Sequence, residues 1–455
     1  MSYTVQKLKK NKLIKKIFVK TFGCQMNEYD SNRIKELAKK AGYFQTQNLL
    51  DADCYVLNTC HIREKASDKV YHEVGRIKKK FRDKKKPILI VAGCVAQAEG
   101  DEMIKKDKYI DGVVGPQSYQ QIPNILKEIE SNKKRINSTD FNVIEKFDSL
   151  NLIRNNDSKI SSFLTIQEGC DKFCNFCVVP YTRGPEHSRS FEEVIIEAKQ
   201  LIENGSREIT LLGQNVNAYN FGKYRLADII YKLNELKSLD RIRFTTSHPK
   251  DMSNDLINAY KECEKLMPVL HLPVQSGSTK ILRLMNRKHT VEEYYEIIDR
   301  LKSINPEIQF SSDFIIGYPG ETDHDFEKTV DLMKKIKFIN SYSYIYSPRP
   351  GTPASLKKTD EKDKLKERLI YFQKISDEIK KDYRKKLLDT NLEILFENRL
   401  SNPNIYFGRD KYQNSVLADS RLNLIGQKKN IKVNNFNHST LFGNILKSQK
   451  KEFAV

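Results

Sequence analysis

The chain has 455 residues, too many for one compact core, so we expect about two to four domains. Apolar residues make up 39% of the sequence and charged residues 30%, a balance typical of globular proteins and not of disordered ones. No apolar run approaches the roughly 18 residues of a membrane-spanning helix. The basic start of the chain also lacks the apolar stretch of a signal peptide. We therefore expect a cytoplasmic protein with no membrane partner.

The charge balance is strongly positive. Lys and Arg number 79 against 59 Asp and Glu, a formal net charge of +20. A chain this basic attracts polyanions, nucleic acid first and anionic membranes second. A biased composition, rich in Lys and without Trp, is the alternative source of the excess. Charge alone therefore leaves RNA binding open.

The first region, 14–130, alternates short apolar runs with helical patterns. Its predicted strands are 17–23, 54–57 and 87–91. Between the first two strands, Ile34, Leu37, Ala38 and Ala41 recur on one helix face. This alternation predicts an α/β multidomain protein that begins with an open parallel α/β sheet. Residues 131–155 are polar without a sustained period, so we expect a linker there.

The region 156–388 resumes the strand–helix alternation. Six strand candidates lie at 163–166, 208–212, 242–246, 269–272, 308–316 and 341–346. Six such repeats predict a partial (β/α)6 barrel, not a closed eight-fold one. A Lys-rich helical stretch then leads into short strand-like pieces separated by Asn, Gly and Ser turns, at 392–396, 415–418, 430–433 and 441–446. This pattern predicts a small β-barrel over 389–452.

Three cysteines directly follow the first strand of the central region. Cys170, Cys174 and Cys177 form a C-x3-C-x2-C motif. Three thiolates this close on a loop can hold three irons of one [4Fe–4S] cluster, which leaves the fourth iron open. A structural zinc site is the alternative, but it favours four ligands in paired C-x2-C knuckles. No fourth partner stands at a matching spacing, so the motif favours an iron–sulfur cluster.

Three further cysteines, Cys24, Cys60 and Cys94, each close a predicted strand of the first region. The carboxyl ends of parallel strands line one crevice, so residues far apart in sequence meet there. A lone cysteine in such a place is usually a small buried apolar residue. Three in the same register favour a second [4Fe–4S] cluster with its own open iron. Cys54 and Cys263 fit neither group, and we assign both to packing.

The C-x3-C-x2-C motif resembles that of the radical S-adenosylmethionine (SAM) superfamily. In that superfamily the methionine part of SAM chelates the open iron, and one-electron reduction releases a 5′-deoxyadenosyl radical. The resemblance implies that Phe176 lies against the adenine. It also implies that DFIIGYPGET is the cofactor loop, with Gly317, Pro319, Gly320 and Glu321. An ordinary βα turn is the alternative for this glycine pair.

With all six cysteines, the chain resembles the radical-SAM methylthiotransferases over about residues 14–450. That family joins an N-terminal methylthiotransferase domain, a radical-SAM core and a C-terminal TRAM domain. Several strings are similar to those of the tRNA-2-methylthio-N6-dimethylallyladenosine synthases, among them TFGCQMNEYDS, NTCHIREKAS, EGCDKFCNFCVVPYTRG, LLGQNVNAY and SPRPGTPA. The barrel region is the loosest match. The implied domains are 14–130, 156–388 and 389–452, with 131–155 as linker.

This resemblance implies both cofactors and a reaction. The first cysteine trio would hold an auxiliary [4Fe–4S] cluster and the second trio the SAM cluster, with no catalytic residue assigned beyond these ligands. C2 of N6-dimethylallyladenosine, 3′ to the anticodon of tRNA, would gain a methylthio group at a cost of two SAM molecules. The implied partners are the tRNA anticodon loop, an electron donor protein and a sulfur donor, and we expect a monomer.

Two other kinds of protein remain as alternatives. A sister methylthiotransferase would act on threonylcarbamoyl-adenosine in tRNA or on an aspartate of a ribosomal protein. A noncatalytic iron–sulfur or RNA-binding protein would explain the charge and the barrel, but not two cysteine trios.

Several polar residues near predicted strand ends carry further expectations. Gln214, Asn215 and Asn217 follow a strand and are expected to face the cofactor, with a turn role as the alternative. For Arg183 and Arg349, contact with a cofactor carboxylate or RNA phosphate and a surface ion pair both stay open. We expect His248 and His271 to be satisfied, partly buried histidines. The lysine runs 78–80 and 84–86 are expected to be solvated helix faces.

Overall fold

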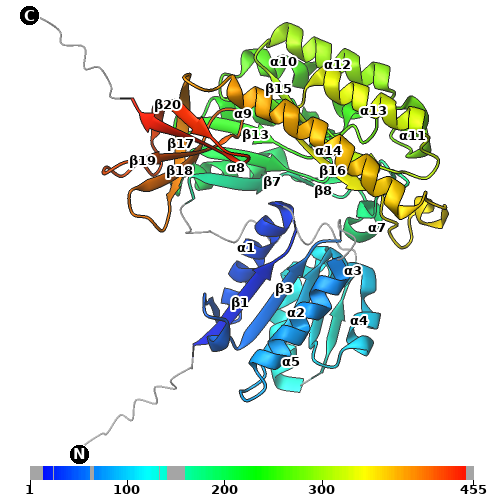
Figure 1. Cartoon of the computed structure of the whole chain (residues 1–455). Helices are drawn as coiled ribbons and strands as arrows, with labels where there is room; N and C mark the ends of the chain where they lie inside the picture. The colour runs from blue at the N-terminus through cyan, green and yellow to red at the C-terminus, as the bar shows by residue number, and fades with distance from the viewer. Residues whose placement is uncertain (1–13, 24, 62–65, 133, 141–158, 447–455) are drawn as a thin grey trace, which may run out of the picture. The chain divides into compact units, whose positions relative to one another are not determined.

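The computed structural model describes residues 14–23, 25–61, 66–132, 134–140 and 159–446. The chain divides into two compact units, Met1–Ile153 and Arg154–Val455, and each is described by itself (Figure 1). Within the described ranges, no helix has both the length and the apolar character needed to cross a bilayer.

Unit 1 is built on one parallel sheet with the strand order β2-β1-β3-β4-β5-β6. Its strands are β1 (Lys15–Thr21), β2 (Tyr43–Gln45), β3 (Cys54–Thr59), β4 (Ile88–Gly93), β5 (Gly112–Val114) and β6 (Ile136–Ser138). The order reverses at β1, where β2 lies on one side and β3 on the other. The predicted open parallel sheet is confirmed.

Helices cover both faces of this sheet (Figure 1). Helices α1 (Gln25–Lys40) and α5 (Ile122–Asn132) pack on one face, and α2 (Ala66–Lys80), α3 (Cys94–Glu99) and α4 (Asp101–Lys106) on the other. Successive strand side chains point to opposite faces, so Val56 joins the core of the first face and Leu57 that of the second. Burial on both sides explains why β3 reads as a continuous apolar run.

Strand β6 lies inside the segment that the sequence places in a linker. Ile136 pairs with Gly112 and Ser138 with Val114, in parallel register. All three residues of β6 are only half-buried, because the strand lies at the edge of the sheet. An edge strand needs no apolar run, so the linker prediction was wrong for Ile136–Ser138. Residues 141–155 of the predicted linker lie outside the described residues.

The core of unit 2 has six parallel strands, taken in chain order. These are β7 (Ser161–Thr165), β10 (Glu208–Leu212), β13 (Arg241–Phe244), β14 (Val269–His271), β15 (Gln309–Ile316) and β16 (Asn340–Ile345). They form two three-stranded sheets, joined by a parallel bridge between Ile242 and Leu266. One apolar core runs through both sheets. The predicted partial barrel is confirmed.

Helices connect these strands and pack outside them (Figure 1). They are α7 (Val179–Arg183), α8 (Phe191–Glu203), α9 (Leu226–Asn234), α10 (Asn254–Glu262), α11 (Thr279–Leu284), α12 (Val291–Ile304), α13 (Asp323–Ile336) and α14 (Lys362–Lys385). Val194 and Ala198 of α8 are buried in the core, as the predicted apolar face requires. The strand–helix alternation therefore places each βα loop at the carboxyl end of its strand.

A closed five-stranded barrel ends the described chain, as predicted. Its order is β17-β18-β19-β21-β20, with β17 (Asn391–Arg399), β18 (Ile405–Arg409), β19 (Ser415–Asp419), β20 (Lys428–Phe436) and β21 (Thr440–Ile445). The sequence analysis did not find β18. A Cβ at buried Gly408 would lie 2.5 Å from the Leu395 carbonyl oxygen. The neighbouring strand comes so close that only glycine fits at this position. An apolar residue there would have completed the pattern that predicts a strand.

Two arginines of β13 fasten the barrel to the core. The Arg243 guanidinium donates to the carbonyl oxygens of Lys411 and Asp410, each at 2.9 Å, and its Nε lies 3.0 Å from Glu208 Oε2. Arg241 Nη1 donates to the Arg409 carbonyl oxygen at 2.7 Å. Both arginines and Glu208 are buried. The Glu208 carboxylate neutralises the buried charge of Arg243, and the carbonyl oxygens of the barrel accept its hydrogen bonds.

The start of α13 gives a pH-dependent prediction. Burial opposes ionisation of Asp325, but hydrogen bonds from Lys280, Thr322 and Ser278 outweigh it and hold the pKa of Asp325 well below its ordinary value. A lowered folded pKa stabilises the fold above the unfolded value of about 3.9, and this stabilisation is lost as pH falls. Asp325→Asn should therefore cost about 2 kcal/mol at pH 7.

Urea unfolding of the cofactor-free protein at several pH values measures this effect. The difference between wild type and Asp325→Asn should shrink as pH falls below about 5. Asp331→Asn, at an exposed position of the same helix, is the control and should match wild type throughout. A cost that stays constant down to about pH 2 contradicts the assignment.

Candidate functional site

The carboxyl edge of the unit 1 sheet carries two of the three N-terminal cysteines. Cys60 directly follows β3, and Cys94 begins α3 directly after β4. The two strands end together, because Thr59 pairs with Gly93. Both cysteines are 8% exposed. Cys24, the third, lies outside the described residues.

Two glycines explain how the chain comes so close to Cys60. Gly23 and Gly93 have φ of 113° and 94°, in the region that favours glycine. A Cβ on Gly23 would lie 2.2 Å from Cys60 Cβ, and one on Gly93 would lie 2.3 Å from the Thr59 carbonyl oxygen. The residues that precede Cys24 and Cys94 therefore both contact the end of β3. Sequence reasoning missed this packing, although the Gly-Cys pairs at 23–24 and 93–94 are the available signal.

Buried polar side chains hold this edge together. Asn58 donates from Nδ2 to the Asn27 carbonyl oxygen at 2.8 Å and to Ser31 Oγ at 2.9 Å, and its Oδ1 accepts from Tyr119 at 3.2 Å. Thr59 Oγ1 donates to the Ala92 carbonyl oxygen at 2.6 Å. These contacts tie β3 to α1 and β4. Sequence reasoning missed them, although an Asn-Thr pair at the end of an apolar strand is the available signal.

The second cysteine trio lies on the loop between β8 (Gln167–Glu168) and α7. Cys174 is buried, whereas Cys170 and Cys177 are half-buried. Burial, with neighbouring cysteines as a lesser cause, raises the pKa of Cys170 and of Cys177 to about 12. Cys174 and Cys177 both contribute to the raised pKa of Cys170, and Cys174 contributes to that of Cys177, so the three sulfurs lie near one another.

Among the described residues, no three His, Cys, Asp or Glu side chains are arranged to hold a single metal ion, but the chemistry of these three sulfurs suits an iron–sulfur cluster. Without a cation, burial and the neighbouring sulfurs keep the thiols of Cys170 and Cys177 protonated at neutral pH. Several groups nevertheless favour thiolates: the backbone at Lys172 and Val179, and the charges of Arg287 and Arg349. Such an arrangement suits sulfurs that ionise when metal binds.

Asn175 fixes the cysteine loop to the rest of unit 2. Its backbone N–H donates to the Met285 carbonyl oxygen at 2.9 Å, and its Nδ2 donates to that of Leu284 at 2.8 Å. Its own carbonyl oxygen accepts from the Ala354 N–H at 3.0 Å. Three separate segments therefore meet at one asparagine inside the motif. Sequence reasoning did not single out Asn175, because nothing local reveals such distant partners.

The predicted cofactor loop lies in the same neighbourhood. Phe176 packs against an apolar cluster that includes Tyr318, and the Cys174 sulfur contributes to a raised pKa of Tyr318. The Gly317 N–H donates to Glu321 Oε2 at 2.7 Å, which closes a tight turn. Gly317 and Gly320 have φ of 73° and 91°. The structure therefore brings Phe176, this loop and Cys174 together.

The GQNVN segment supports the start of the cysteine loop. Gln214 Oε1 accepts from the Gly169 N–H at 2.7 Å, one residue before Cys170. Asn215 Nδ2 donates to Glu186 at 3.1 Å and to Asp251 at 2.7 Å.

Asn217 and His271 have structural roles, whereas His248 differs from its prediction. Asn217 exchanges two hydrogen bonds with the backbone of His248, so the turn alternative holds for it. His271 is satisfied as predicted, with Nδ1 2.9 Å from Ser311 Oγ. The prediction was wrong for His248. Its Nδ1 accepts from Lys250, but its buried Nε2 has no hydrogen-bond partner among the described residues.

Arg183 and Arg349, whose roles the sequence left open, have different surroundings. Arg183 lies 3.6 Å from Glu168, with both side chains buried, so the ion pair is present but is not at the surface. Arg349 donates to Ser347 Oγ at 2.6 Å, and its charge acts to lower the pKa of Cys177, which places it toward the cysteines.

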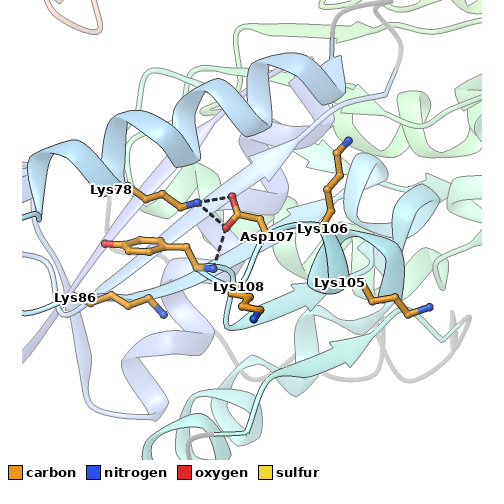
Figure 2. Close-up of a pocket in the computed structure, with 7 residues that line it drawn as sticks. Lys78, Lys86, Lys105, Lys106, Asp107 and Lys108 are labelled. Carbon is orange, nitrogen blue, oxygen red and sulfur yellow. Dashed lines mark hydrogen bonds and ion pairs between the residues drawn. The ribbon is translucent and has the colours of Figure 1, made fainter.

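A shallow hollow of 570 Å³ lies at the amino edge of the unit 1 sheet. Figure 2 shows the side chains that line it, which are Lys78, Lys86, Lys105, Lys106, Asp107, Lys108 and Tyr109. Lys78 pairs with Asp107 at 2.7 Å and Lys86 with Asp111 at 2.5 Å. Carboxylates thus offset part of the charge. The hollow lies at the opposite end of the strands from Cys60 and Cys94, and Lys78 and Lys86 belong to the predicted solvated runs.

Comparisons with known proteins agree over most of the chain. Family models match at residues 164–333, for the radical SAM superfamily, and at 16–115, for the uncharacterized protein family UPF0004. A Pelagibacter ubique protein named tRNA-2-methylthio-N(6)-dimethylallyladenosine synthase is 56% identical and covers 97% of this chain and 100% of its own. A Rickettsia canadensis protein of the same name is 46% identical, covering 95% and 99%.

Among solved structures, the radical S-adenosylmethionine methyltransferase TsrM from Kitasatospora setae matches with a TM-score of 0.57 at 10% identity, covering 76% of this chain and 74% of its own. That likeness shows the fold alone. Because the named relatives match almost end to end, the resemblance predicted from the cysteine strings is confirmed: the chain belongs to the family of tRNA-2-methylthio-N(6)-dimethylallyladenosine synthases.

Proposed function

We propose that this protein transfers a methylthio group to C2 of N6-dimethylallyladenosine, 3′ to the anticodon of tRNA, by SAM-dependent radical chemistry in the cytoplasm. The observation that carries the proposal is 56% identity over 97% of the chain to a relative named for this product. The C2–H bond of adenine has no leaving group and no usefully acidic proton, so acid–base catalysis has little to act on. Radical chemistry suits such a bond.

Cys170, Cys174 and Cys177 would hold the SAM cluster. A [4Fe–4S] cluster with an open iron supplies the one-electron chemistry that splits SAM. Asn175 and Gln214 hold the loop that presents the three sulfurs. Phe176 and the turn with Gly317, Pro319 and Gly320 would flank the cofactor. Asn215 lies beside the cysteine loop and would also face the cofactor. These assignments rest on the contacts around Cys174.

Cys24, Cys60 and Cys94 would hold the auxiliary cluster that supplies sulfur. Support comes from the convergence of Gly23, Cys60 and Gly93 at one end of the unit 1 sheet. This end adjoins the point where the strand order reverses, and open α/β sheets bind ligands there.

The remaining assignments follow the same resemblance. Residues 14–130 would form the methylthiotransferase domain, 156–388 the radical-SAM core and 389–452 a TRAM domain. The net charge of +20 supports phosphate contacts with the anticodon arm of tRNA. The target base would leave its stack to react. An electron donor protein and a sulfur donor would complete the cycle, and we propose a monomer.

Gly23 provides a test of the auxiliary site that leaves every cysteine in place. Gly23→Ala would drive a Cβ into Cys60, so we expect reconstituted protein to hold about four irons where wild type holds about eight. Gly42→Ala is the matched control, since Gly42 also has a left-handed φ, of 86°, but nothing lies within 4 Å of its Cβ position. It should keep the wild-type iron content. Equal iron in both variants would contradict the site.

Mass spectrometry of tRNA nucleosides tests the function itself. A bacterium that lacks its own 2-methylthio activity should gain 2-methylthio-N6-dimethylallyladenosine when it expresses this protein, with a matching fall in N6-dimethylallyladenosine. A methylthio group found instead on threonylcarbamoyl-adenosine, or on a ribosomal protein, would overturn the substrate assignment.

A further inference from the structure

Arg287 carries a buried charge beside the cysteine loop of unit 2. Its side chain is 6% exposed. Nη1 lies 3.6 Å from Cys174 Sγ, and Nη2 donates to the Pro273 carbonyl oxygen. Nε is buried without a hydrogen-bond partner among the described residues. A buried guanidinium needs a counter-charge, so the groups around Arg287 indicate what it binds.

The other groups around Arg287 do not supply that counter-charge. In the described part of the chain, no carboxylate forms an ion pair with it. His248 and His289 lie nearby, with their rings 5.6 Å apart. Burial lowers the pKa of both histidines, and the Arg287 charge lowers it further, to about 4 for His289. Both rings are therefore neutral at physiological pH. The Cys174 sulfur, which would become a thiolate on binding the cluster, is the partner within reach.

The backbone holds this arginine in place at some cost. Asn286 and Lys288, on either side of it, have φ of 58° and 61°, which is unfavourable for residues other than glycine. Asn286 Nδ2 donates to the Phe173 carbonyl oxygen at 2.8 Å. The turn that carries Arg287 is thereby joined to the residue before Cys174. Strain that persists at such a joint indicates a constrained position.

We propose that Arg287 is a positioning residue for the SAM cluster, which donates a hydrogen bond to the Cys174 sulfur and favours the reduced form of the cluster. This inference rests on the proposed cluster ligands. A [4Fe–4S] cluster with three thiolates is already anionic, and one electron from a low-potential donor adds a further negative charge. A fixed cation and a hydrogen bond to sulfur both stabilise that added charge, which raises the reduction potential.

A potentiometric titration followed by electron paramagnetic resonance tests the inference. The protein is Cys60→Ala/Cys94→Ala, so that the SAM cluster alone is observed, reconstituted anaerobically and reduced with dithionite and mediators in the absence of SAM. At the potential where half of this parent is reduced, Arg287→Met should show about a tenfold lower ratio of reduced to oxidised cluster. That ratio equals a shift of about 59 mV for one electron. Arg283→Gln, which removes an exposed cation nearby, should match the parent.

The outcomes separate the inference from the proposed site. A parent protein with no cluster signal would sink the ligand assignment. A normal parent signal with an unshifted Arg287→Met titration would overturn the role of Arg287 while leaving the site intact. If Arg287→Met holds fewer than about four irons, the neutral variant Arg287→Gln takes its place in the titration. A clearly lower ratio of reduced to oxidised cluster than in the parent supports the role of Arg287, and an unchanged ratio overturns it.

Discussion

Replacing Cys60 and Cys94 together with alanine is expected to abolish methylthio transfer and yet leave the cleavage of SAM intact. The auxiliary site would supply sulfur, whereas the radical would arise at the other cysteine trio. Reconstituted Cys60→Ala/Cys94→Ala should hold about four irons against about eight for wild type. Given SAM and dithionite, it should still form 5′-deoxyadenosine and no methylthio nucleoside, as measured by mass spectrometry.

The complementary variant should lose both activities. Cys170→Ala/Cys174→Ala/Cys177→Ala removes the proposed SAM cluster, so neither 5′-deoxyadenosine nor product should form. Cys263→Ala is the control, because Cys263 is buried in the apolar core of unit 2 and should leave both activities in place. Product formation by the Cys60→Ala/Cys94→Ala protein would show that the sulfur comes from elsewhere.

Arg243→Ala should produce the largest loss of stability, because it leaves buried Glu208 without its partner. The change also removes the donor to the carbonyl oxygens of Asp410 and Lys411. Breaking a buried pair of this kind costs about 3–5 kcal/mol. Urea unfolding should show that loss, and limited proteolysis should release a fragment beginning near the barrel.

The matched control is Arg207→Ala. Arg207 pairs with Asp240 at 2.6 Å, but its side chain is 40% exposed, and exposed pairs contribute about 0–1 kcal/mol. A double change, Arg243→Leu/Glu208→Leu, should recover part of the stability, because it removes the unpaired charge. Equal losses for Arg207→Ala and Arg243→Ala would refute the fastening role.

Local patterns predicted most of this fold. The buried strands β3 and β10 consist largely of apolar residues, and β15 ends in the apolar run 314–316, so their positions followed from the sequence. Strand β6 was missed, because an edge strand needs no apolar run, and β18 was missed where Gly408 replaces an inward side chain. Strands β2 and β5 were also missed, because three residues are too few to show a pattern. Secondary structure was therefore hardest to predict where a strand is short, exposed or crowded.

The candidate site divides in the same way. The cysteine spacing is local, so the sequence alone was enough to propose the trios. The partners of Asn175, at Leu284, Met285 and Ala354, are more than a hundred residues away and leave no local trace. The same holds for Arg287, which reads as one basic residue among many until folding brings it to Cys174.

The attachment through Arg241 and Arg243 has a consequence for how an RNA would be held. Glu208 and Arg241 are the first residues of their strands, whereas the Cys170 loop follows the far end of neighbouring β7. A five-residue strand is about 16 Å long, so the attachment at Arg241 lies about that far from the proposed SAM site. An RNA bound by the barrel would therefore be held at a distance from the proposed SAM site. Neutralising basic residues of the barrel should therefore raise KM and spare kcat.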